Sequence, residues 1–231
     1  MPNEKPLSAR LSGAIPYVTK GGIVADVGTD HAYLPLYLCL TGHIRGAVAA
    51  DVREGPLRSA KTNIKAFGLD GKIDTCLSDG LRELAPFAPE DISIFGMGGE
   101  LIASILADVP WTKDKRLRFI LQPMTKTETL RAYLDAEGFV ILDETLTKED
   151  GRIYQTLAVE YDGTVRTHTP LELLVGKKNL ARGGALLHEL LALKQKLLAE
   201  VEASKTAAGV SADYETALLS EIRTYIKENP L

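Results

Sequence analysis

Short apolar runs alternate with amphipathic stretches over the first two thirds of the chain. The apolar runs, built from small and branched residues, predict strands at 23–27, 46–51, 73–77, 91–95 and 118–121. The amphipathic stretches predict helices at 7–18, 34–40, 55–67, 100–107, and from a Thr125-x-x-Glu128 capping box to Gly138. Because strands that alternate with helices form parallel sheets, we expect an α/β fold with helices on both faces of one sheet.

Two longer strands are predicted next, at 139–147 and 153–161, with the polar turn Glu149-Asp150-Gly151 between them. A connection this short joins antiparallel neighbours. We therefore expect the mostly parallel sheet to carry an antiparallel hairpin at one edge.

The remainder of the chain has a helical pattern. A polar linker at 162–170 leads to a predicted short helix at 173–184. Leu186, Leu190, Leu193, Leu197 and Val201 then step by four and three residues, which predicts one packing face of a long helix. After a break at 205–210, Ser211 is a candidate N-cap for a last helix that reaches Asn229. We predict a sheet domain at 1–162 and a helical hairpin domain at 163–231.

Composition places few limits on this picture. The 231 residues suit one α/β domain with an extension, and 45% hydrophobic residues is ordinary for a globular protein. The sequence contains no apolar run near the roughly 20 residues of a membrane span, and its start predicts no secretion signal. Cys39 and Cys76 fall inside predicted elements, so we expect reduced core thiols and a cytoplasmic protein.

The net charge and the number of possible metal ligands also exclude few classes of function. Two cysteines without a CxxC motif and four scattered histidines argue against a zinc site, and we expect no metal. The net charge of −4 neither requires nor excludes a nucleic-acid partner, because phosphate binding depends on local patches of positive charge.

The stretch from Ile23 to Pro35 reads as strand, sharp turn and helix, which is how nucleotide-binding units open. It lacks the G-x-G-x-x-G of dinucleotide enzymes. Asp26 and Asp30 flank the turn and would repel a pyrophosphate, but they suit a ligand with a cationic centre and an ammonium group, as S-adenosylmethionine has. The alternative is a plain turn with a solvated acid.

Further acids and glycines follow the next strands, at the edge of a parallel sheet where ligands bind. Asp51 suits two ribose hydroxyls, a role that nicotinamide and S-adenosylmethionine enzymes share. Asp79 is placed to accept a hydrogen bond from an adenine amino group, although Asp79-Gly80 also suits a plain turn. Gly28 and Gly96 would let the backbone pass close to a ligand.

The run Asp26-Val-Gly-Thr-Asp-His-Ala-Tyr-Leu-Pro35, with Gly96-Met-Gly-Gly99 and Leu121-Gln-Pro123, resembles the bacterial tRNA adenine-22 N1-methyltransferases, the TrmK family. The resemblance extends from about Leu7 to Tyr161, and the helical hairpin is similar in kind to that family's coiled-coil domain. It implies a class I, Rossmann-like methyltransferase fold, S-adenosylmethionine as donor, and N1 of an adenine in the tRNA D-loop region as target.

The strand-end positions, together with the resemblance, give the expected donor-binding residues. They are Asp26, Gly28, Thr29, Asp30, His31, Asp51, Val52, Asp79, Gly80, Gly96, Met97, Gly98 and Gly99. Many methyltransferases that act on amino groups carry Asn/Asp-Pro-Pro-aromatic after the fourth strand. This chain has Gly-Met-Gly-Gly there, which agrees with a ring nitrogen as target.

Adenine N1 is mostly unprotonated at neutral pH, so it can attack a sulfonium methyl group without a strong base. Alignment and exclusion of water then matter most. We expect Asp30 to stabilise the cationic product base, and His31 and Tyr33 to place the base. His31 would alternatively be only a capping donor, and Tyr33 a packing residue.

Positive side chains near the predicted site and in the helical region are candidates for tRNA contacts. They are Arg10, Arg53, Arg58, Lys177, Lys178 and Arg182. The hairpin would clamp the tRNA, or else serve as a stabilising or dimerising appendage. We expect a monomer or weak dimer that does not bind a membrane. Two other functions stay open, a methyltransferase for a small molecule or protein, and an RNA-binding module without turnover.

Overall fold

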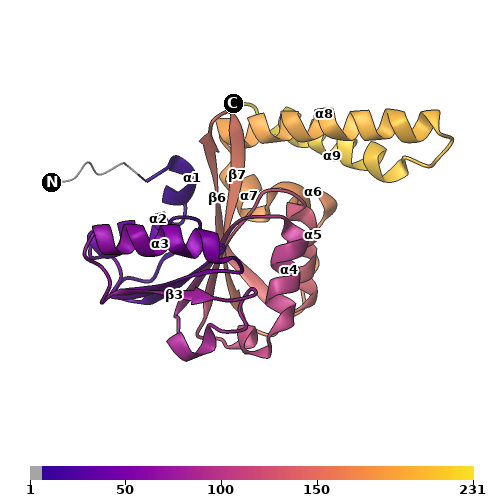
Figure 1. Cartoon of the computed structure of the whole chain (residues 1–231). Coiled ribbons are helices and arrows are strands. Elements are labelled where there is room, and N and C mark those ends of the chain that lie inside the picture. Colours follow the sequence, from indigo (N-terminus) through magenta and orange to yellow (C-terminus); the bar gives the residue numbers. More distant parts are fainter. Residues whose placement is uncertain (1–6) are drawn as a thin grey trace. The chain divides into compact units, whose positions relative to one another are not determined.

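The computed structural model describes residues 7–231, which form two compact units that divide between Arg166 and Thr167. The first unit is built around a seven-stranded sheet with the strand order β3-β2-β1-β4-β5-β7-β6 (Figure 1). Strands β1 to β5 are parallel, whereas β7 runs antiparallel to both β5 and β6. The predicted fold class and the antiparallel hairpin at the edge are confirmed.

The elements of this unit follow the predicted order. Its strands are β1 (Ile23–Val27), β2 (Gly46–Asp51), β3 (Ile73–Leu77), β4 (Asp91–Met97), β5 (Arg118–Pro123), β6 (Phe139–Glu149) and β7 (Arg152–Tyr161). Its α-helices are α1 (Ala9–Ser12), α2 (Tyr33–Leu40), α3 (Glu54–Ala66), α4 (Gly99–Asp108) and α5 (Thr127–Ala136). Short 3₁₀ turns are η1 (Ile15–Tyr17), η2 (Ala85–Phe87) and η3 (Pro110–Lys113).

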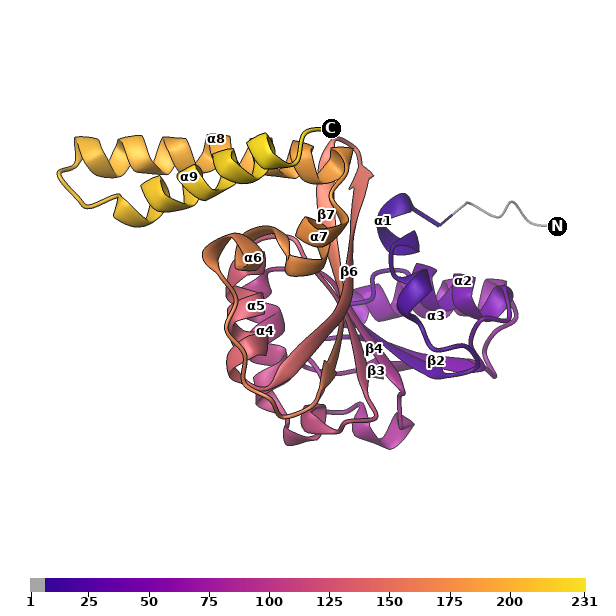
Figure 2. The same cartoon turned by 180° about the vertical axis from the view of Figure 1, so that it is seen from behind.

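The sheet separates two apolar cores, because alternate side chains of each strand point to opposite faces. Ala25 of β1 packs in the core that includes Leu106 of α4 and Leu130 of α5. Its neighbour Val24 packs in the core that includes Leu38 of α2 and Ile64 of α3. The two views in Figures 1 and 2 show these helix pairs on either side of the sheet. Helices on both faces leave the carboxyl edge of the parallel strands open to a ligand.

The predicted helix at 7–18 is wrong in its extent. Only α1 and the 3₁₀ turn η1 form there, with Ser8 capping α1 through a hydrogen bond from the Leu11 amide. Gly13 closes α1, and Pro16 lies in the 3₁₀ turn. Proline lacks an amide hydrogen and clashes with the preceding helical turn, so a continuous helix across it is unfavourable.

The capping box predicted at Thr125 is also absent. Helix α5 begins at Thr127, after Lys126 in the left-handed region, and no side chain caps it. The carbonyl of Thr125 instead accepts a hydrogen bond from the Gly99 amide at 2.7 Å. The Thr125 carbonyl thus joins two loops, and Leu130 makes its helical hydrogen bond to Lys126, one residue later than predicted.

The second unit is helical, with α6 (Pro170–Val175), α7 (Lys177–Arg182), α8 (Ala185–Ala207) and α9 (Asp213–Glu228). The single helix predicted at 173–184 is two helices, because Gly176 at φ 95° interrupts it. Helices α8 and α9 form the expected antiparallel hairpin (Figure 1). Helix α9 starts after Ala212, one residue later than the predicted cap Ser211, whose hydroxyl accepts the Asp213 amide.

The packing face predicted for α8 is correct at Leu190 but wrong at Leu193, Leu197 and Val201. Leu187, Leu190 and Leu191 are buried, whereas Leu193 and Leu197 are 49% and 47% exposed. Val201 is 43% exposed as well. Apolar residues occur on more than one side of this helix, so the sequence pattern does not identify the side that packs.

The two cysteines are not in a disulfide. Cys39 is buried in α2, as predicted, but Cys76 is only half-buried because β3 is the edge strand. No helix within residues 7–231 is both long enough and apolar enough to span a bilayer.

Candidate active site

The turn after β1 is held tightly against its neighbours. The amides of Gly28 and Thr29 both donate to the carbonyl of Ala50, at 2.9 Å each. Gly28 has φ 76°, a region that favours glycine, and a Cβ atom there would lie 2.3 Å from the Met97 side chain. The turn therefore keeps its backbone close to the ends of both β2 and β4.

Asp26 lies beneath this turn rather than at its surface. It is 9% exposed, and the hydroxyl of Ser93 on β4 donates to its Oδ1 at 2.8 Å. Burial raises the pKa of Asp26, and hydrogen bonds from Ser93 and Thr29 and the charge of Arg10 oppose that rise. Asp26 thus places a carboxyl group under the strand ends and links β1 to β4.

Asp51 ends β2 on the same face of the sheet, because Asp26 pairs with Ala49 and Asp51 lies two residues beyond it. Its side chain is almost fully buried. Oδ1 accepts the Arg53 amide at 2.8 Å, and Oδ2 has no hydrogen-bond donor among residues 7–231. One oxygen is thus available to hydroxyl groups.

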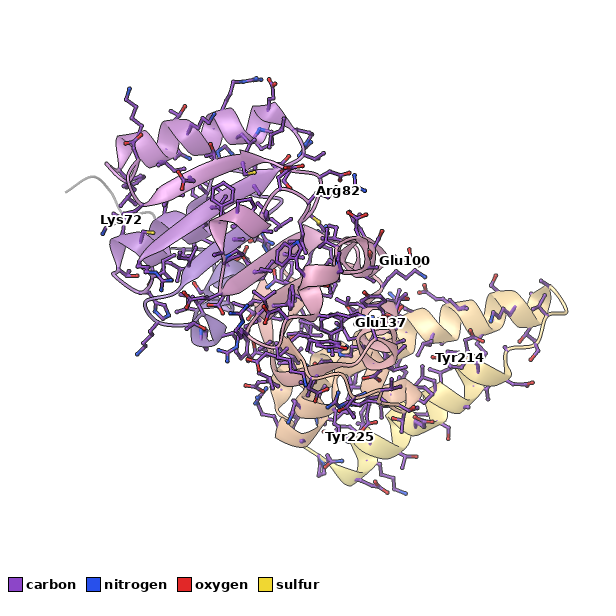
Figure 3. The ribbon with its side chains drawn as sticks, turned by 90° about the horizontal axis from the view of Figure 1, so that it is seen from below. Lys72, Arg82, Glu100, Glu137, Tyr214 and Tyr225 are labelled. Atoms are coloured by element: carbon purple, nitrogen blue, oxygen red, sulfur yellow. The ribbon has the colours of Figure 1, made fainter. Side chains whose placement is uncertain are left out.

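The end of β3 adjoins Asp51, whose carbonyl accepts the Ser78 amide at 3.1 Å. Asp79 lies in the following turn with its side chain 67% exposed, and Arg82 donates to its Oδ2 at 2.9 Å. Arg82, which is labelled in Figure 3, also pairs with Asp108. The structure therefore brings Asp26 and Asp51 onto one face, and places Asp79 in the adjacent turn with one oxygen already bound.

Two apolar side chains are unusually exposed beside these acids. Val52 follows β2 and is 60% exposed, and Leu77 ends β3 and is 53% exposed. Because β2 and β3 are paired neighbours, the two side chains lie at one edge of the sheet. They offer apolar surface that a flat ring would cover.

The loop after β4 is held by hydrogen bonds to the loop after β5. Met97 accepts the Met124 amide at 2.8 Å through its carbonyl, and Gly99 donates to Thr125. A Cβ atom on Gly99 would lie 2.1 Å from the Lys126 carbonyl oxygen. Gly96, at φ 76°, has open space where a side chain would stand, and the nearest atom is the Arg10 guanidinium at 3.9 Å.

The three predicted catalytic residues lie together at the start of α2. The rings of His31 and Tyr33 stack with their centroids 5.1 Å apart, and His31 Nε2 is 3.4 Å from an Asp30 carboxylate oxygen. Ala32 between them adopts φ 57°, and its amide donates to the Thr29 hydroxyl. Asn63 of α3 donates to the His31 carbonyl at 3.1 Å, so the loop is anchored from two sides.

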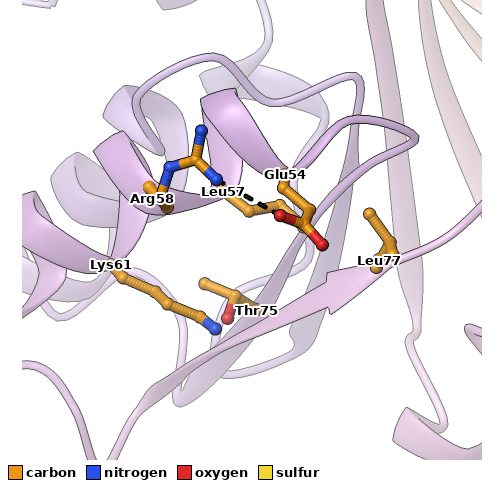
Figure 4. A pocket seen from close by; sticks show the side chains of 6 residues that line it. All are labelled: Glu54, Leu57, Arg58, Lys61, Thr75 and Leu77. Carbon is orange, nitrogen blue, oxygen red and sulfur yellow. Dashed lines mark hydrogen bonds and ion pairs between the residues drawn. The ribbon is translucent and has the colours of Figure 1, made fainter.

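The predicted cationic contacts fall in different places. Arg53 lies near Asp51, and Arg58 pairs with Glu54 at 3.2 Å near the start of α3. That helix and β3 border a shallow pocket of about 250 Å³, to which Arg58 also contributes (Figure 4). Lys177, Lys178 and Arg182 lie on α7 in the second unit.

Arg10 differs from the other cations, because it is half-buried and contacts the site itself. Three further residues adjoin these groups and are not predicted from the sequence: Ser93 donates to Asp26, Gln122 accepts from Arg10, and Leu77 is exposed at the end of β3. Ser93 and Gln122 have a signal, since each is a polar residue within an apolar strand. Leu77 has none, because an apolar residue at a strand end is ordinary.

The site residues fit S-adenosylmethionine on structural grounds. The free Asp51 oxygen suits ribose hydroxyls, the exposed Val52 and Leu77 side chains suit a purine, and the bare backbone at Gly96 leaves room for a ligand. In the described part of the chain no group of three or more His, Cys, Asp or Glu side chains could hold a metal ion.

Comparison with known proteins identifies the family. A family model described as "Methyltransferase domain" matches residues 7–157. The tRNA (adenine(22)-N(1))-methyltransferase of Bacillus subtilis is 39% identical over 171 residues, which cover 70% of this chain and 71% of that relative. The chain belongs to this methyltransferase family.

Solved structures extend the likeness over nearly the whole chain. B. subtilis TrmK, described as an m1A22 tRNA methyltransferase, has a TM-score of 0.82 at 29% identity, and the match covers 97% of this chain and 99% of TrmK. Sp1610 of Streptococcus pneumoniae, solved with S-adenosyl-L-methionine, has a TM-score of 0.83 at 31% identity, with 94% and 99% covered. The predicted family and its fold with a C-terminal helical extension are confirmed.

Proposed function

We propose that this chain transfers a methyl group from S-adenosylmethionine to N1 of adenine 22 in tRNA. The observation that carries the proposal is the 39% identity to the B. subtilis tRNA (adenine(22)-N(1))-methyltransferase, over more than two thirds of both chains. The strand-end geometry supports the same donor, because it offers groups suited to a ribose, a purine and a cationic centre at one edge of the sheet. A tRNA-modifying activity fits a cytoplasmic enzyme.

The donor site uses residues from adjacent strand ends. Oδ2 of Asp51 would accept ribose hydroxyls, Val52 and Leu77 would cover the purine, and the second oxygen of Asp79 would accept the adenine amino group. When bound, S-adenosylmethionine supplies an electrophilic methyl group on a cationic sulfur. The remaining proposed contacts, in the turns after β1, β3 and β4, are Asp26, Gly28, Thr29, Asp30, His31, Gly80, Gly96, Met97, Gly98 and Gly99.

The target base needs positioning more than activation, because its N1 lone pair is already available. The stacked His31 and Tyr33 rings leave Tyr33 51% exposed, which offers a face on which an adenine can stack. The base gains positive charge as N1 is methylated. The Asp30 carboxylate, beside His31 at 3.4 Å, is the group that would stabilise this charge.

Contacts to the tRNA body would come from both units. Arg53 and Arg58 near the start of α3 have side chains 74% and 73% exposed, so they can reach phosphates. On α7 of the second unit the proposed contacts are Lys177, Lys178 and Arg182. We propose that the helical unit holds the tRNA and that the enzyme acts as a monomer or weak dimer.

Transfer from a donor labelled in its methyl group, followed by mapping of the modified nucleoside, tests the function. We expect 1-methyladenosine at position 22 of bulk bacterial tRNA, and no transfer to a transcript in which guanine replaces adenine 22. Equal labelling of both transcripts, or labelling only of proteins or small molecules, would refute the proposal. Calorimetry with S-adenosylhomocysteine and NAD tests the donor class separately, and a preference for NAD would exclude this donor.

A further inference from the structure

Helix α1 is short, yet its backbone is fixed by strands far away in the sequence. The Arg10 amide donates to Glu149 of β6 at 2.7 Å, and the Arg10 carbonyl accepts from Gln122 of β5 at 3.0 Å. Figures 1 and 2 both show α1 beside the β6–β7 hairpin. Arg10 is therefore held in place through both of its own peptide groups.

Gln122 also sets the direction of the Arg10 side chain. It is fully buried at the end of β5, and its amide nitrogen donates to the Arg10 carbonyl and to the Thr156 hydroxyl at 2.8 Å. Both amide hydrogens are thus used, so the amide oxygen faces the Arg10 guanidinium, which donates to it at 3.3 Å. A neutral amide orients the guanidinium and leaves its positive charge uncompensated. A carboxylate in the same place would neutralise that charge.

The guanidinium that results is charged, half-buried and incompletely hydrogen-bonded. Its carbon lies 5.7 Å from the centre of the Tyr154 ring, within range of a cation–π contact. Nη1 is 3.9 Å from the position that a Cβ atom on Gly96 would take. Within residues 7–231 the Nε and Nη2 groups have no hydrogen-bond acceptor.

Within residues 7–231 the nearby acids accept no hydrogen bond from this guanidinium, although its charge lowers the pKa of Asp26. Glu149 accepts the Arg10 main-chain amide, and Asp26 accepts the Ser93 hydroxyl. A guanidinium has five donor hydrogens in a planar fork that matches an oxyanion. Such a group beside the bare backbone of Gly96 has the properties of an anion subsite.

We propose that Arg10 binds an oxyanion beside Gly96, and that this oxyanion is the carboxylate at the methionine end of the donor. The inference rests on the proposed donor site and changes the role expected for Arg10 from a tRNA contact to a donor contact. The amino-acid end of the donor is zwitterionic. Arg10 would take its carboxylate, while Asp26 and Asp30 at the β1 turn favour its ammonium group. A tRNA phosphate is the other source of the same oxyanion chemistry.

Binding measurements without catalysis test this assignment. We compare S-adenosylhomocysteine with methylthioadenosine, which lacks the amino-acid end, on the wild type, Arg10→Gln, and the exposed control Arg116→Gln. We expect Arg10→Gln to lower the affinity for S-adenosylhomocysteine about tenfold to a hundredfold, as loss of a charged hydrogen bond does. The affinity for methylthioadenosine should stay within about twofold of the wild-type value. Arg116→Gln should change neither affinity.

Other results overturn the assignment. An equal loss of affinity for both ligands would mean that Arg10 only supports the fold. Unchanged affinity for both, with unchanged tRNA binding, would mean that Arg10 contacts neither the donor nor the tRNA. Unchanged S-adenosylhomocysteine affinity, with a salt dependence of tRNA binding reduced by about one phosphate contact, would assign the oxyanion to tRNA instead. These outcomes are independent of methyl transfer, so they do not depend on the proposed reaction succeeding.

A second variant addresses the case in which Arg10→Gln does not fold. Gln122→Glu keeps the arginine and puts a carboxylate where the amide oxygen lies 3.3 Å from Nη1, but it removes the amide hydrogens that bind the Arg10 carbonyl and Thr156. Unchanged methylthioadenosine affinity is therefore the control that the site remains folded. The new carboxylate would form an ion pair with the Arg10 guanidinium and compete with the carboxylate of the ligand. We expect a selective loss of S-adenosylhomocysteine affinity again, and unchanged affinity would contradict the proposal.

Discussion

The hydroxyl of Ser93 donates to the carboxyl of Asp26 at 2.8 Å across the β1–β4 pair. This contact lies inside the sheet, beneath the turn that is proposed to hold the donor. Burial raises the pKa of Asp26 more than its hydrogen bonds and the charge of Arg10 lower it. The folded protein thus binds a proton at this site more readily than the unfolded chain does. Keeping Asp26 ionised at neutral pH therefore costs stability.

Asp26→Asn should raise the melting temperature at pH 7, because asparagine can accept the Ser93 hydroxyl without carrying a charge. The advantage should shrink as the pH falls through the raised pKa of Asp26 towards 3.8, where the wild type becomes protonated. For a chain of this size about 1 kcal/mol corresponds to roughly 2–4 °C. Thermal melts across pH measure the difference, with the exposed Asp74→Asn as control. A difference that does not depend on pH would contradict the assignment.

The Gly99 amide and Thr125 carbonyl join the loops after β4 and β5, so Gly99→Ala should be destabilising. Its Cβ atom would lie 2.1 Å from the Lys126 carbonyl oxygen, which is backbone and cannot rotate away. We expect a loss of about 1–3 kcal/mol in the free energy of unfolding, as overpacking typically costs. Gly55→Ala is the matched control, since Gly55 also lies in the first turn of a helix and has open space around it. Equal effects of the two substitutions would refute this argument.

The strand ends of the site are readable from sequence because they depend on local pattern. Asp26 and Asp51 each lie at or near the end of an apolar run, and the order of strands and helices places those ends at one edge. Gly28 marks the turn that follows β1. These relationships need only the alternation of elements and the rule that parallel strands end at a common edge.

Tertiary contacts account for what the sequence does not predict. Arg10 and Gln122 are 112 positions apart, so no local pattern links them. Thr125 has the sequence of a cap, but α5 begins at Thr127 and the Thr125 carbonyl bonds Gly99 of another loop. In α8 the pattern predicts a helix but not its buried side, because that side depends on which surface other elements cover.

Asp51→Asn should weaken donor binding while preserving the fold. Asparagine can still accept the Arg53 amide, which Oδ1 of Asp51 accepts at 2.8 Å, but it removes the negative charge from the oxygen proposed to bind ribose. We expect about a tenfold loss of S-adenosylhomocysteine affinity by calorimetry, consistent with loss of a charge-assisted hydrogen bond. Asp74→Asn on β3 should leave the affinity unchanged. Unaltered binding by Asp51→Asn would exclude the ribose role.

Asp30→Ala should separate donor binding from turnover. The Asp30 side chain is 80% exposed and contacts His31 at the surface, so its removal should leave the fold unchanged. We expect methyl transfer to be abolished while S-adenosylhomocysteine affinity survives in part, because the carboxylate is proposed to stabilise charge on the target base. Single-turnover assays at saturating donor measure the rate directly. A wild-type rate would remove Asp30 from the mechanism.

Arg131 on α5 and Glu144 on β6 form a buried ion pair at 2.6 Å, and Gln155 on β7 accepts from the same arginine nitrogen at 2.9 Å. Arg131→Met would leave the Glu144 charge buried without this partner, so we expect a loss of about 3–5 kcal/mol in unfolding free energy by denaturant titration. Replacing Glu144 by leucine in the same chain should restore much of the loss. The control is the pair of Asp114 and Arg116, whose side chain is 89% exposed, and Arg116→Met should not shift the denaturation midpoint measurably. If both single substitutions had equal effects, burial would not be the source of the cost.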